Sequence, residues 1–445
     1  MTSLIISNCT EEIVGDLALL TADQCRSFGW GAQRMLWYAR NGDIVVLPGQ
    51  PDGDFLTYVT GLTGTDPSSL TLLIPPPGEF GADILSPDRL ANEEFREQLR
   101  LAATERAVGS VLSVYTDFAV ADLARATGIG DGLAGMRFSA EQGDAIVNSK
   151  AIFRAVAAAA GTPIARGLVT GRREQAMALI CELLEQGDHV MVKKEFAAGG
   201  FGNEILSPAP GVRAAGAPQV VVLTDRVAVA DYLAERWSWL TGDGHSRLVI
   251  EQYLPQIATV YAEFEATDSG CTLRGTGEIV MAPTAVGEII PPQSIEAETH
   301  RTLVELAHLV CERFRLFGYR GNICADAIVT PDGEIVFTET NGRLTASTHL
   351  HVNMVGRVVD AARRRDRVFM ERAGQLTVPS FAHALEQLAA SGLGYDDDAA
   401  TGVVLTANYV PVNGRVTYCV VAESLVAAQA TEEKLLEVMA GVFAR

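Results

Sequence analysis

A predicted hairpin in the C-terminal half of the chain carries three oxygen-bearing side chains. Residues 323–329 and 334–339 are short apolar runs typical of strands, with a turn between them. Asp326 lies in the first strand and Glu339 at the end of the second, and Asn341 shares the face of Glu339 because strand side chains alternate. Carboxylate and amide oxygens bind Mg²⁺, which keeps substrate phosphates as its other ligands. The hairpin therefore predicts a magnesium site, and a purely structural salt-bridged hairpin is the alternative.

An arginine follows the hairpin on the same face. Arg343 comes two residues after Asn341, so an extended backbone directs both side chains the same way. A guanidinium group at this place can stabilise charge that develops on a transferred phosphoryl group or on a tetrahedral oxyanion. We therefore predict Arg343 as the catalytic residue.

A lysine-bearing strand leads directly into a glycine-rich loop. Residues 189–196 are predicted as the strand and residues 197–203 as the loop, and the positions of interest are Lys193, Lys194, Gly199, Gly200 and Gly202. Ammonium groups bind phosphate oxygens, and glycine N–H groups approach a phosphate with no side chain in the way. The pattern predicts a clamp for a nucleoside triphosphate, although the chain contains no GxxxxGK[ST] motif. An exposed edge strand with an ordinary hairpin loop is the alternative.

Lysine is scarce in this chain, and its positions support the clamp. Only four of the 35 Lys and Arg residues are lysines, and three of them, Lys150, Lys193 and Lys194, lie within 45 positions of one another. A planar guanidinium does not replace a compact ammonium where a single point charge is needed. The clustering favours a functional requirement over chance, whereas Lys434 is expected on the surface of a helix.

A further segment offers contacts for a nucleobase. Residues 247–255 form an apolar strand that opens into an extended segment, which contains Glu251, Gln252, Tyr253 and Leu254. Unpaired backbone groups of such a segment can bind the edge of adenine, and Glu251 can accept a hydrogen bond from the exocyclic amine. An ordinary strand that ends in a charged residue is the alternative.

Taken in order, the motifs between residues 146 and 350 resemble those of the ATP-grasp superfamily. The resemblance implies that Lys150 and Lys193 contact the phosphates of ATP, with Lys194 as an alternative because the lysine doublet blurs the alignment by one residue. It also implies that the glycine loop closes over the γ-phosphate and that Glu251 faces adenine. The implied ligands of Mg²⁺, or alternatively of Mn²⁺, are Asp326, Glu339 and Asn341. No clear acid for the ribose contact follows Pro255, and Glu263 and Glu265 are the candidates.

The resemblance extends to function. The pattern from Glu339 to Arg343 is similar to that of bacterial amino-acid and peptide ligases, and the whole chain resembles a peptide ligase of natural-product biosynthesis. This implies that an amino-acid-like carboxylate is joined to the N-terminal amine of a peptide through an acyl phosphate, with ADP and phosphate as products. His349 and His351 are expected to line the acceptor side or to pack as ordinary loop residues. A homodimer is one assembly that the resemblance allows.

Two other functions stay open at this point. One is an ATP-grasp phosphotransferase with a histidine, such as His351, or a hydroxyl as the acceptor. The other is a non-catalytic nucleotide-binding module. The complete set of predicted metal ligands, together with Arg343, argues against the second.

Strands that alternate with helices predict an α/β (α+β) chain, and the resemblance implies the ATP-grasp fold. The expected parts are an N-terminal α/β domain similar to a pre-ATP-grasp domain (1–145), a central lid domain (146–255), a C-terminal ATP-grasp domain with the metal site (256–375) and a C-terminal extension that packs on the ligase core (376–445). The expected helices include 149–160 with Ser149 as its cap, 298–316, and 432–443 with Thr431 as its cap.

The net charge argues against two classes of partner. Lys+Arg 35 against Asp+Glu 55 gives −20 at pH 7, and both nucleic acid and an anionic membrane surface need a basic footprint. No apolar run is long enough to span a membrane, and the N-terminus lacks the basic region of a leader. Seven scattered cysteines without a CxxC pair are typical of a reducing compartment, so we expect a cytoplasmic protein.

Overall fold

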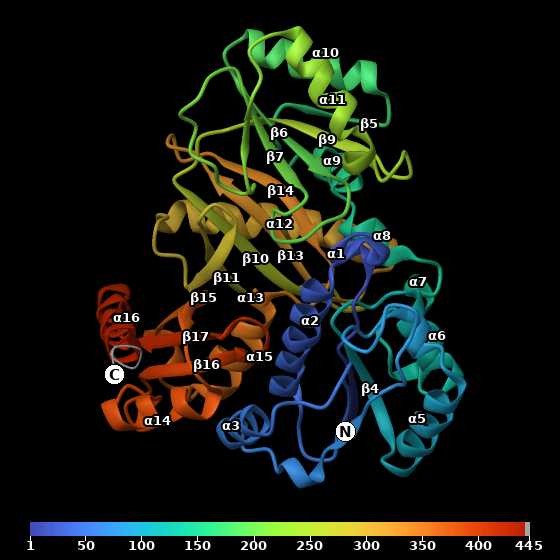
Figure 1. Cartoon of the computed structure of the whole chain (residues 1–445), viewed down its shortest axis with the longest axis vertical. Helices are drawn as coiled ribbons and strands as arrows, with labels where there is room; N and C mark the ends of the chain where they lie inside the picture. Colours follow the sequence, from blue (N-terminus) through green and yellow to red (C-terminus); the bar gives the residue numbers. More distant parts are fainter. Residues whose placement is uncertain (441–445) are drawn as a thin grey trace.

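The computed structural model describes residues 1–440, which form three β-sheets with helices packed against them. Figure 1 shows the central sheet and its helices, in green, above the longest sheet, in yellow to red, with the N-terminal elements in blue below. No helix within the described residues is both long and apolar enough to cross a membrane.

The N-terminal sheet is parallel and has the strand order β3-β2-β1-β4. It contains β1 (Thr2–Ile6), β2 (Ile44–Val46), β3 (Thr71–Leu73) and β4 (Val108–Ser113), with α1 (Glu11–Val14), α2 (Ala22–Gly31), α3 (Gly53–Thr63), α4 (Pro87–Leu90), α5 (Glu93–Glu105), α6 (Phe118–Ala126), α7 (Met136–Ser139) and α8 (Gly143–Asn148) around or after it. Both faces of β2 are buried, as expected for a parallel sheet covered by helices. The carboxyl ends of its strands meet at one edge, which is where open parallel sheets bind ligands.

The central sheet has the order β5-β9-β6-β7-β8. Its elements are α9 (Lys150–Ala160), β5 (Gly167–Thr170), α10 (Arg173–Glu185), β6 (His189–Lys194), β7 (Asn203–Ser207), β8 (Val220–Val222), α11 (Arg226–Thr241) and β9 (Leu248–Tyr253). Val190 and Val192 of β6 belong to the core that α10 and α11 cover. Alternation therefore turns Lys193 to the opposite face, where its Nζ donates a hydrogen bond to the carbonyl of Thr338 in the third sheet at 3.3 Å.

The third sheet is antiparallel and has eight strands in the order β14-β13-β10-β11-β12-β15-β17-β16. Its elements are β10 (Ala258–Ala266), β11 (Cys271–Met281), β12 (Ala285–Ile290), α12 (Ala297–Phe317), β13 (Gly321–Val329), β14 (Ile335–Asn341), α13 (Ala346–His349), a π-helix (Leu350–Val358), β15 (Val368–Thr377), α14 (Phe381–Ser391), β16 (Gly402–Tyr409), α15 (Val410–Asn413), β17 (Arg415–Ala422) and α16 (Leu425–Ala440). The apolar stripe of α12 covers one face, with Leu303, Val310 and Phe314 fully buried. The other face of this sheet is turned toward the central sheet.

The predicted helices at 149–160 and 298–316 are confirmed to within one residue at each end, and Ser149 caps the first of them. The prediction for the last helix is wrong at its start. Helix α16 begins at Leu425, and Thr431 lies inside it, where its hydroxyl donates to the carbonyl of Ala427 at 3.0 Å. The helix starts early because Ser424 accepts a hydrogen bond from the backbone of Ala427. Residues 441–443 of the predicted helix lie outside the described residues.

Candidate active site

A cavity of about 240 Å³ lies between the central sheet and the eight-stranded sheet; we call it the inter-sheet cavity. It brings together most of the residues predicted from the sequence, namely Lys193, Gly199, Gly200, Glu251, Gln252, Tyr253, Leu254, Asp326, Glu339, Asn341 and Arg343. Lys150 reaches the same place indirectly, because its Nζ lies 2.9 Å from Oε2 of Glu339. Gly202 and Lys194 do not line this cavity.

The three predicted metal ligands are neighbours on the hairpin of β13 and β14. Asp326 and Glu339 are directly paired in the ladder. The Nδ2 of Asn341 donates to Oδ2 of Asp326 at 2.9 Å, and Nη2 of Arg343 donates to Oδ1 of Asn341 at 2.6 Å. Burial and the adjacent Glu339 carboxylate raise the pKa of Asp326. Burial acts in the same direction on Glu339, but the ammonium of Lys150 holds the pKa of Glu339 below its usual range.

This donor set fits a divalent cation such as Mg²⁺. The raised pKa of Asp326 indicates that the protein's own cations do not fully compensate the negative charge at this place. No three His, Cys, Asp or Glu side chains converge anywhere in residues 1–440, so a cation here needs the amide oxygen of Asn341 and oxygens from a bound phosphate. Mg²⁺ is bound in this way in proteins. The Asn341 amide can present its oxygen after a flip, because its two ends have the same shape.

Strand β6 directs its two lysines to opposite sides. Lys193 lies in the inter-sheet cavity, 2.5 Å from Oε2 of Glu251. Lys194 points to the other face, where its Nζ lies 5.1 Å from the ring centroid of Trp239, and burial lowers the pKa of Lys194. This geometry favours Lys193 over Lys194 as the lysine that meets a phosphate.

Glu251 is held by two cations. Its Oε2 pairs with Lys193, and its Oε1 lies 2.5 Å from Nη1 of Arg154. Both carboxylate oxygens are therefore occupied, and the predicted contact of Glu251 with adenine stays a prediction. Sequence reasoning missed Arg154, although a signal was available: Arg154 follows Lys150 by one helical turn on α9, so both side chains share the face that meets the site.

The glycine loop is built around backbone conformations that favour glycine. Gly199 and Gly200 have φ values of 64° and 83°. A Cβ on Gly200 would lie 2.8 Å from the carbonyl oxygen of Gly216, and one on Gly202 would lie 2.4 Å from Cβ of Ala197. The loop also contacts the N-terminal domain, because the N–H of Ala198 donates to the carbonyl of Ile13 at 3.2 Å. Gly202 thus shapes the loop, while Gly199 and Gly200 line the cavity.

His349 and His351, which follow the hairpin of β13 and β14, are buried. They line neither the inter-sheet cavity nor the larger cavity described below. The Nδ1 of His349 is hydrogen-bonded to Nδ2 of Asn353 at 3.1 Å, and Nε2 of His351 lies 3.2 Å from the hydroxyl of Tyr261. Burial lowers the pKa of His351 to about 4. In the structure both histidines are packed in the interior, which is the alternative to lining the acceptor side.

Comparisons with known proteins bear on the fold of the chain. The Pre ATP-grasp domain model matches residues 32–129, and the PGM1 C-terminal domain model matches residues 383–435. No curated protein sequence matches the chain. The solved structures it resembles include the biotin carboxylase of Campylobacter jejuni (13% identity, TM-score 0.58, 98% of this chain and 91% of that one). The likeness extends over nearly the whole length of both chains.

Two further structures give the same result. The biotin carboxylase domain of the 2-oxoglutarate carboxylase of Hydrogenobacter thermophilus, in complex with MgADP, is 14% identical with a TM-score of 0.59, and the match covers 98% of this chain and 89% of that one. The N5-carboxyaminoimidazole synthetase of Staphylococcus aureus, in complex with ADP, is 11% identical with a TM-score of 0.55 over 98% and 96%. The chain has the ATP-grasp fold. At these identities the likeness shows the fold and not the reaction.

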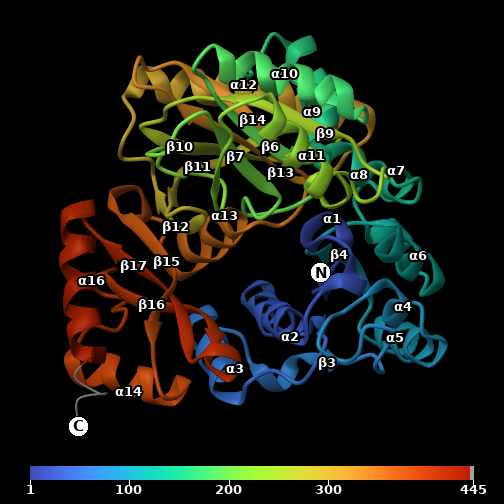
Figure 2. The same ribbon diagram turned by 45° about the horizontal axis from the view of Figure 1, so that its top comes forward.

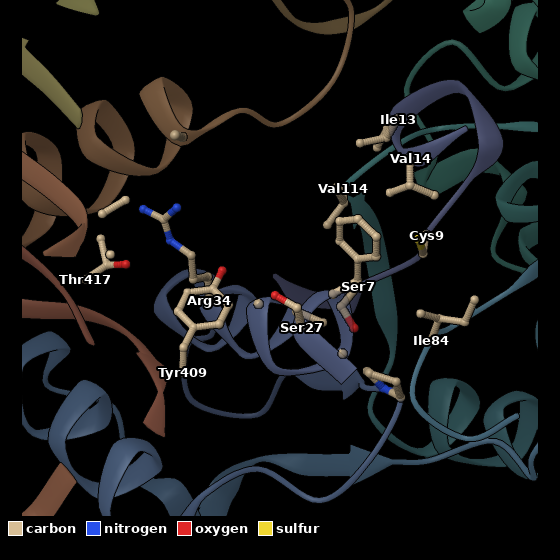
Figure 3. Close-up of a pocket in the computed structure, with 18 of the residues that line it drawn as sticks. Ser7, Cys9, Ile13, Val14, Ser27, Arg34, Ile84, Val114, Tyr409 and Thr417 are labelled. Atoms are coloured by element: carbon tan, nitrogen blue, oxygen red, sulfur yellow. The ribbon is translucent and has the colours of Figure 1, made fainter. Parts of the chain in front are cut away.

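Within this fold, a second and larger cavity of about 600 Å³ adjoins the first. It lies between the two regions that the domain models match. On the N-terminal side its wall contains Ser7, Pro48 and Val114, which follow the carboxyl ends of β1, β2 and β4. On the C-terminal side it contains Tyr409 and Thr417, and Figure 3 shows both of them near Arg34 of the segment after α2. No sequence motif pointed to this large cavity, because its wall is assembled from single residues of many elements.

The two cavities share part of their walls. Ala285, Glu288 and Ala346 line both. Figure 2 shows α2 between the N-terminal sheet and the C-terminal strand β16, and α2 is in contact with β16. The fold therefore places a small cavity, lined by most of the residues predicted to bind phosphate and metal, directly against a larger cavity.

Proposed function

We propose that this chain is an ATP-dependent ligase that joins a carboxylate to an amine through an acyl phosphate. The observation that carries the proposal is the position of the inter-sheet cavity. Most of the side chains predicted to bind phosphate and metal and to stabilise charge line this cavity, which shares Glu288 with a cavity large enough for an organic substrate. The ADP and MgADP complexes among the structural relatives support ATP and Mg²⁺ as cofactors, and Mn²⁺ is an alternative cation.

The proposed reaction has two steps. An oxygen of the substrate carboxylate attacks the γ-phosphorus of ATP, the bond to the β-phosphate oxygen breaks, and an acyl phosphate and ADP result. The amine then attacks the acyl carbon, the bond between that carbon and the phosphate oxygen breaks, and an amide and inorganic phosphate result. Mg²⁺, when bound, neutralises phosphate charge. The protein contributes mainly position and charge, which are the main requirements of phosphoryl transfer.

Individual side chains have distinct parts in this proposal. Lys193 binds phosphate oxygens and Lys150 orients Glu339, to which it is already paired. Asp326, Glu339 and Asn341 hold the cation. Arg343 stabilises negative charge on the transferred phosphoryl group and on the tetrahedral species. The loop at 197–203 covers the site and excludes water, which would otherwise hydrolyse the acyl phosphate.

The finer proposal concerns the substrates. The motif order and the whole chain resemble the peptide ligase of pheganomycin biosynthesis, and the match of the PGM1 C-terminal domain model covers residues 383–435. We therefore extend the proposal to an amino-acid-like, non-proteinogenic carboxylate and the N-terminal amine of a peptide, in the biosynthesis of a peptide antibiotic in the cytoplasm. A homodimer is proposed as the assembly; the Hydrogenobacter relative is described as a dimer.

The test is a substrate screen with the full-length protein, ATP and Mg²⁺. Amino-acid carboxylates are combined with single amino acids and short peptides, and ADP release and product mass are measured. We expect ADP, phosphate and a product lighter by one water than the sum of its substrates. Hydroxylamine in place of the amine should trap the acyl phosphate as a hydroxamate. Release of AMP and pyrophosphate would contradict the acyl phosphate mechanism.

Two outcomes of the same screen would favour the competing functions. With [γ-³²P]ATP and no amine, a stable phosphoprotein would indicate a phosphotransferase. The burial of His349 and His351 argues against this outcome. Binding of ATP with no ADP released by any substrate mixture would indicate a non-catalytic module.

A further inference from the structure

Glu288 lies at the boundary of the two cavities and faces the reaction site. It is paired with Ile279 in the ladder, Ile279 with Thr259, and Thr259 with Ile328. Directly paired residues share a face of a sheet, and Ile328 shares its face with the residue two positions earlier, Asp326. The side chain of Glu288 therefore stands on the same face of the eight-stranded sheet as the predicted metal ligand.

One carboxylate oxygen of Glu288 is buried without a hydrogen-bond partner in the described residues. The side chain is only 6% exposed. Its Oε1 accepts a hydrogen bond from the hydroxyl of Ser347 at 3.1 Å, whereas its Oε2 has no partner within residues 1–440. A buried, unsatisfied carboxylate oxygen is unfavourable, and a bound group that donates hydrogen bonds removes this penalty.

The charges around Glu288 favour a cation. The residue paired with it on β15 is Glu371, whose Oε1 lies 2.7 Å from Nη2 of Arg34 and accepts from the hydroxyl of Thr406 at 2.7 Å. Arg34 pairs with Glu371 and also interacts with the charge of Glu288, so a single guanidinium faces two carboxyl groups at this end of the large cavity. Two carboxyl groups that share one guanidinium favour the binding of a further positively charged group.

The other end of the large cavity has the opposite charge. Arg415 begins β17, is exposed, and lines the cavity. Glu371 is paired with Cys419, four residues along β17 from Arg415. Two strand spacings and four strand residues separate Glu288 from Arg415, which corresponds to about 16 Å, or about five residues of extended peptide.

The wall between these two ends is largely apolar. It includes Ile13 and Val14 of α1, with Cys9, Ile84 and Val114 nearby, and Figure 3 shows these side chains across the cavity from Arg34 and Tyr409. Apolar walls with a few placed polar groups are typical of ligand sites. A volume of about 600 Å³ exceeds the needs of one amino acid and suits a short peptide.

We propose that the large cavity binds a linear peptide of about five residues with its amino terminus inward, that Glu288 binds the terminal ammonium and accepts its proton, and that Arg415 binds the terminal carboxylate. This inference rests on the proposed ligase function for its chemistry. It adds the binding site, the direction of the chain and the residue that prepares the amine.

The proton balance of the second step follows. Glu288 accepts one proton from the terminal ammonium, and the neutral amine attacks the acyl carbon of the acyl phosphate. The carbon–nitrogen bond forms, the bond from carbon to the phosphate oxygen breaks, and the electron pair leaves with phosphate. The second proton of the amine is lost to the departing phosphate.

The pKa of Glu288 suits a group that accepts a proton from the terminal ammonium. Burial and the neighbouring Glu371 raise the pKa of Glu288 to about 8. A peptide amino terminus has a pKa of about 8, so proton transfer between the two groups is close to balanced, which general catalysis requires. The groups that face Glu288 are Glu371, Ser347, Tyr261, Glu263 and the guanidinium of Arg34.

The experiment measures peptide binding to the full-length protein saturated with MgADP, by isothermal titration calorimetry. The probes are penta-alanine, its N-acetyl form and its C-terminal amide. We expect the wild type to bind penta-alanine at least 10-fold more tightly than N-acetyl-penta-alanine. Glu288→Gln should abolish this preference while it keeps the hydrogen bond to Ser347, and Glu288→Asp should retain part of it. Equal affinity of the wild type for both probes, or an unchanged preference in Glu288→Gln, would overturn the assignment of Glu288.

The direction of the chain is tested separately with Arg415→Ala. We expect it to weaken binding of penta-alanine about 10-fold, to the affinity of the C-terminal amide, and to leave the affinity for the amide unchanged. If Arg415→Ala weakened both probes equally, or neither, the outward position of the carboxylate would be wrong. Thermal melting of each variant verifies that it is folded.

A kinetic experiment separates the inference from the proposed function. With a carboxylate identified in the screen, Glu288→Gln should slow ligation to penta-alanine much more than it slows hydroxamate formation with hydroxylamine, because hydroxylamine needs no ammonium site. Ligation to penta-alanine should fall about 100-fold. Equal loss of both rates would show that Glu288 has a structural role only. If no carboxylate supports ADP release, the proposed function fails while the binding result stands alone.

Discussion

At the scale of single residues, Lys193 and Lys194 are neighbours on β6, and the sequence did not decide which of them would contact a phosphate. Lys193 is 5% exposed and pairs with Glu251 inside the inter-sheet cavity, whereas Lys194 packs on Trp239 at the other face. The reason is the alternation of strand side chains. Alternation alone does not decide which lysine faces the cavity. That follows from Val190 and Val192, whose side chains face the helices.

Lys193→Arg should reduce ligation at least about 100-fold, because a planar guanidinium in a buried pair misplaces the phosphate contact, where small errors are costly. Lys194→Arg should change the rate less than about 5-fold, and Lys434→Arg, on the exposed side of α16, should have no measurable effect. The measurement is ADP release under saturating substrates. Full activity of Lys193→Arg would contradict its assignment to the phosphates.

Glu263 gives a prediction of pH dependence. This residue of β10 is fully buried, and neither of its carboxylate oxygens has a partner within residues 1–440. Burial raises its pKa from 4.5 to about 8, with Asp326 acting in the same direction and Thr348, Thr345 and Arg274 acting against it. Between these two pH values the unfolded chain has released this proton and the folded chain keeps it. The free energy of unfolding therefore falls as pH rises from about 4.5 to about 8.

Glu263→Gln removes this ionisation, so we expect its Tm to exceed that of the wild type by about 5 °C at pH 8 and to equal it near pH 4.5. The matched control is Glu265→Gln, an exposed carboxyl on the same strand, which should change Tm by less than about 2 °C at either pH. A lower Tm of Glu263→Gln at pH 8 would show that the folded protein needs the charged carboxylate.

At the scale of elements, the site depends on three segments. The local sequence pattern predicts the conformation of helix α9 and of the hairpin of β13 and β14, but it does not predict that of the glycine loop. Ser149 caps α9 and so places Lys150 in the first turn of the helix, beside Glu339. The hairpin of β13 and β14 sets Asp326 opposite Glu339. The glycine loop is different, because its conformation depends on distant partners, Ile13 of α1 and Gly216 of the following loop.

Gly200→Ala should therefore reduce ligation at least about 10-fold and raise the KM for ATP, because the added Cβ meets the carbonyl of Gly216 at 2.8 Å. Gly211→Ala is the matched control, since Gly211 also has a positive φ, of 104°, but open space around it. Both variants should lose about 1–2 kcal/mol of stability from the left-handed backbone, and only the first should lose activity. Equal kinetics of the two variants would show that the loop conformation is not needed for turnover.

At the scale of the whole molecule, the C-terminal segment is part of the sheet that carries the site. The predicted boundary at 375 falls inside β15, and β15, β17 and β16 continue the sheet of β10 to β14 without interruption. The core of this region includes Val403, Leu405 and Val420, all fully buried. This continuity also places Arg415 and Tyr409 in the wall of the large cavity.

A chain that ends at residue 375 should thus fail to fold rather than yield an active core, because the loss of β16 and β17 exposes an apolar face and an unpaired edge. We expect insoluble protein or the absence of a cooperative melting transition, measured by soluble yield and calorimetry. A soluble fragment 1–375 with a sharp transition and wild-type affinity for MgADP would show that the extension is an independent domain.

The sequence by itself determined the local elements and indicated most of the side chains that line the inter-sheet cavity. The stripe of α12, the strand with Lys193 and the hairpin with Asp326 and Glu339 were predictable because each depends on neighbours a few residues away, and the fold class is confirmed. Only the tertiary structure decided that Arg154 and Lys193 hold Glu251, that the histidines are buried, and that Glu288 stands between two cavities. These facts depend on strands and helices that are distant in the chain. A short-range pattern carries no information about them, because burial and charge neighbours are set by the packing of the sheets.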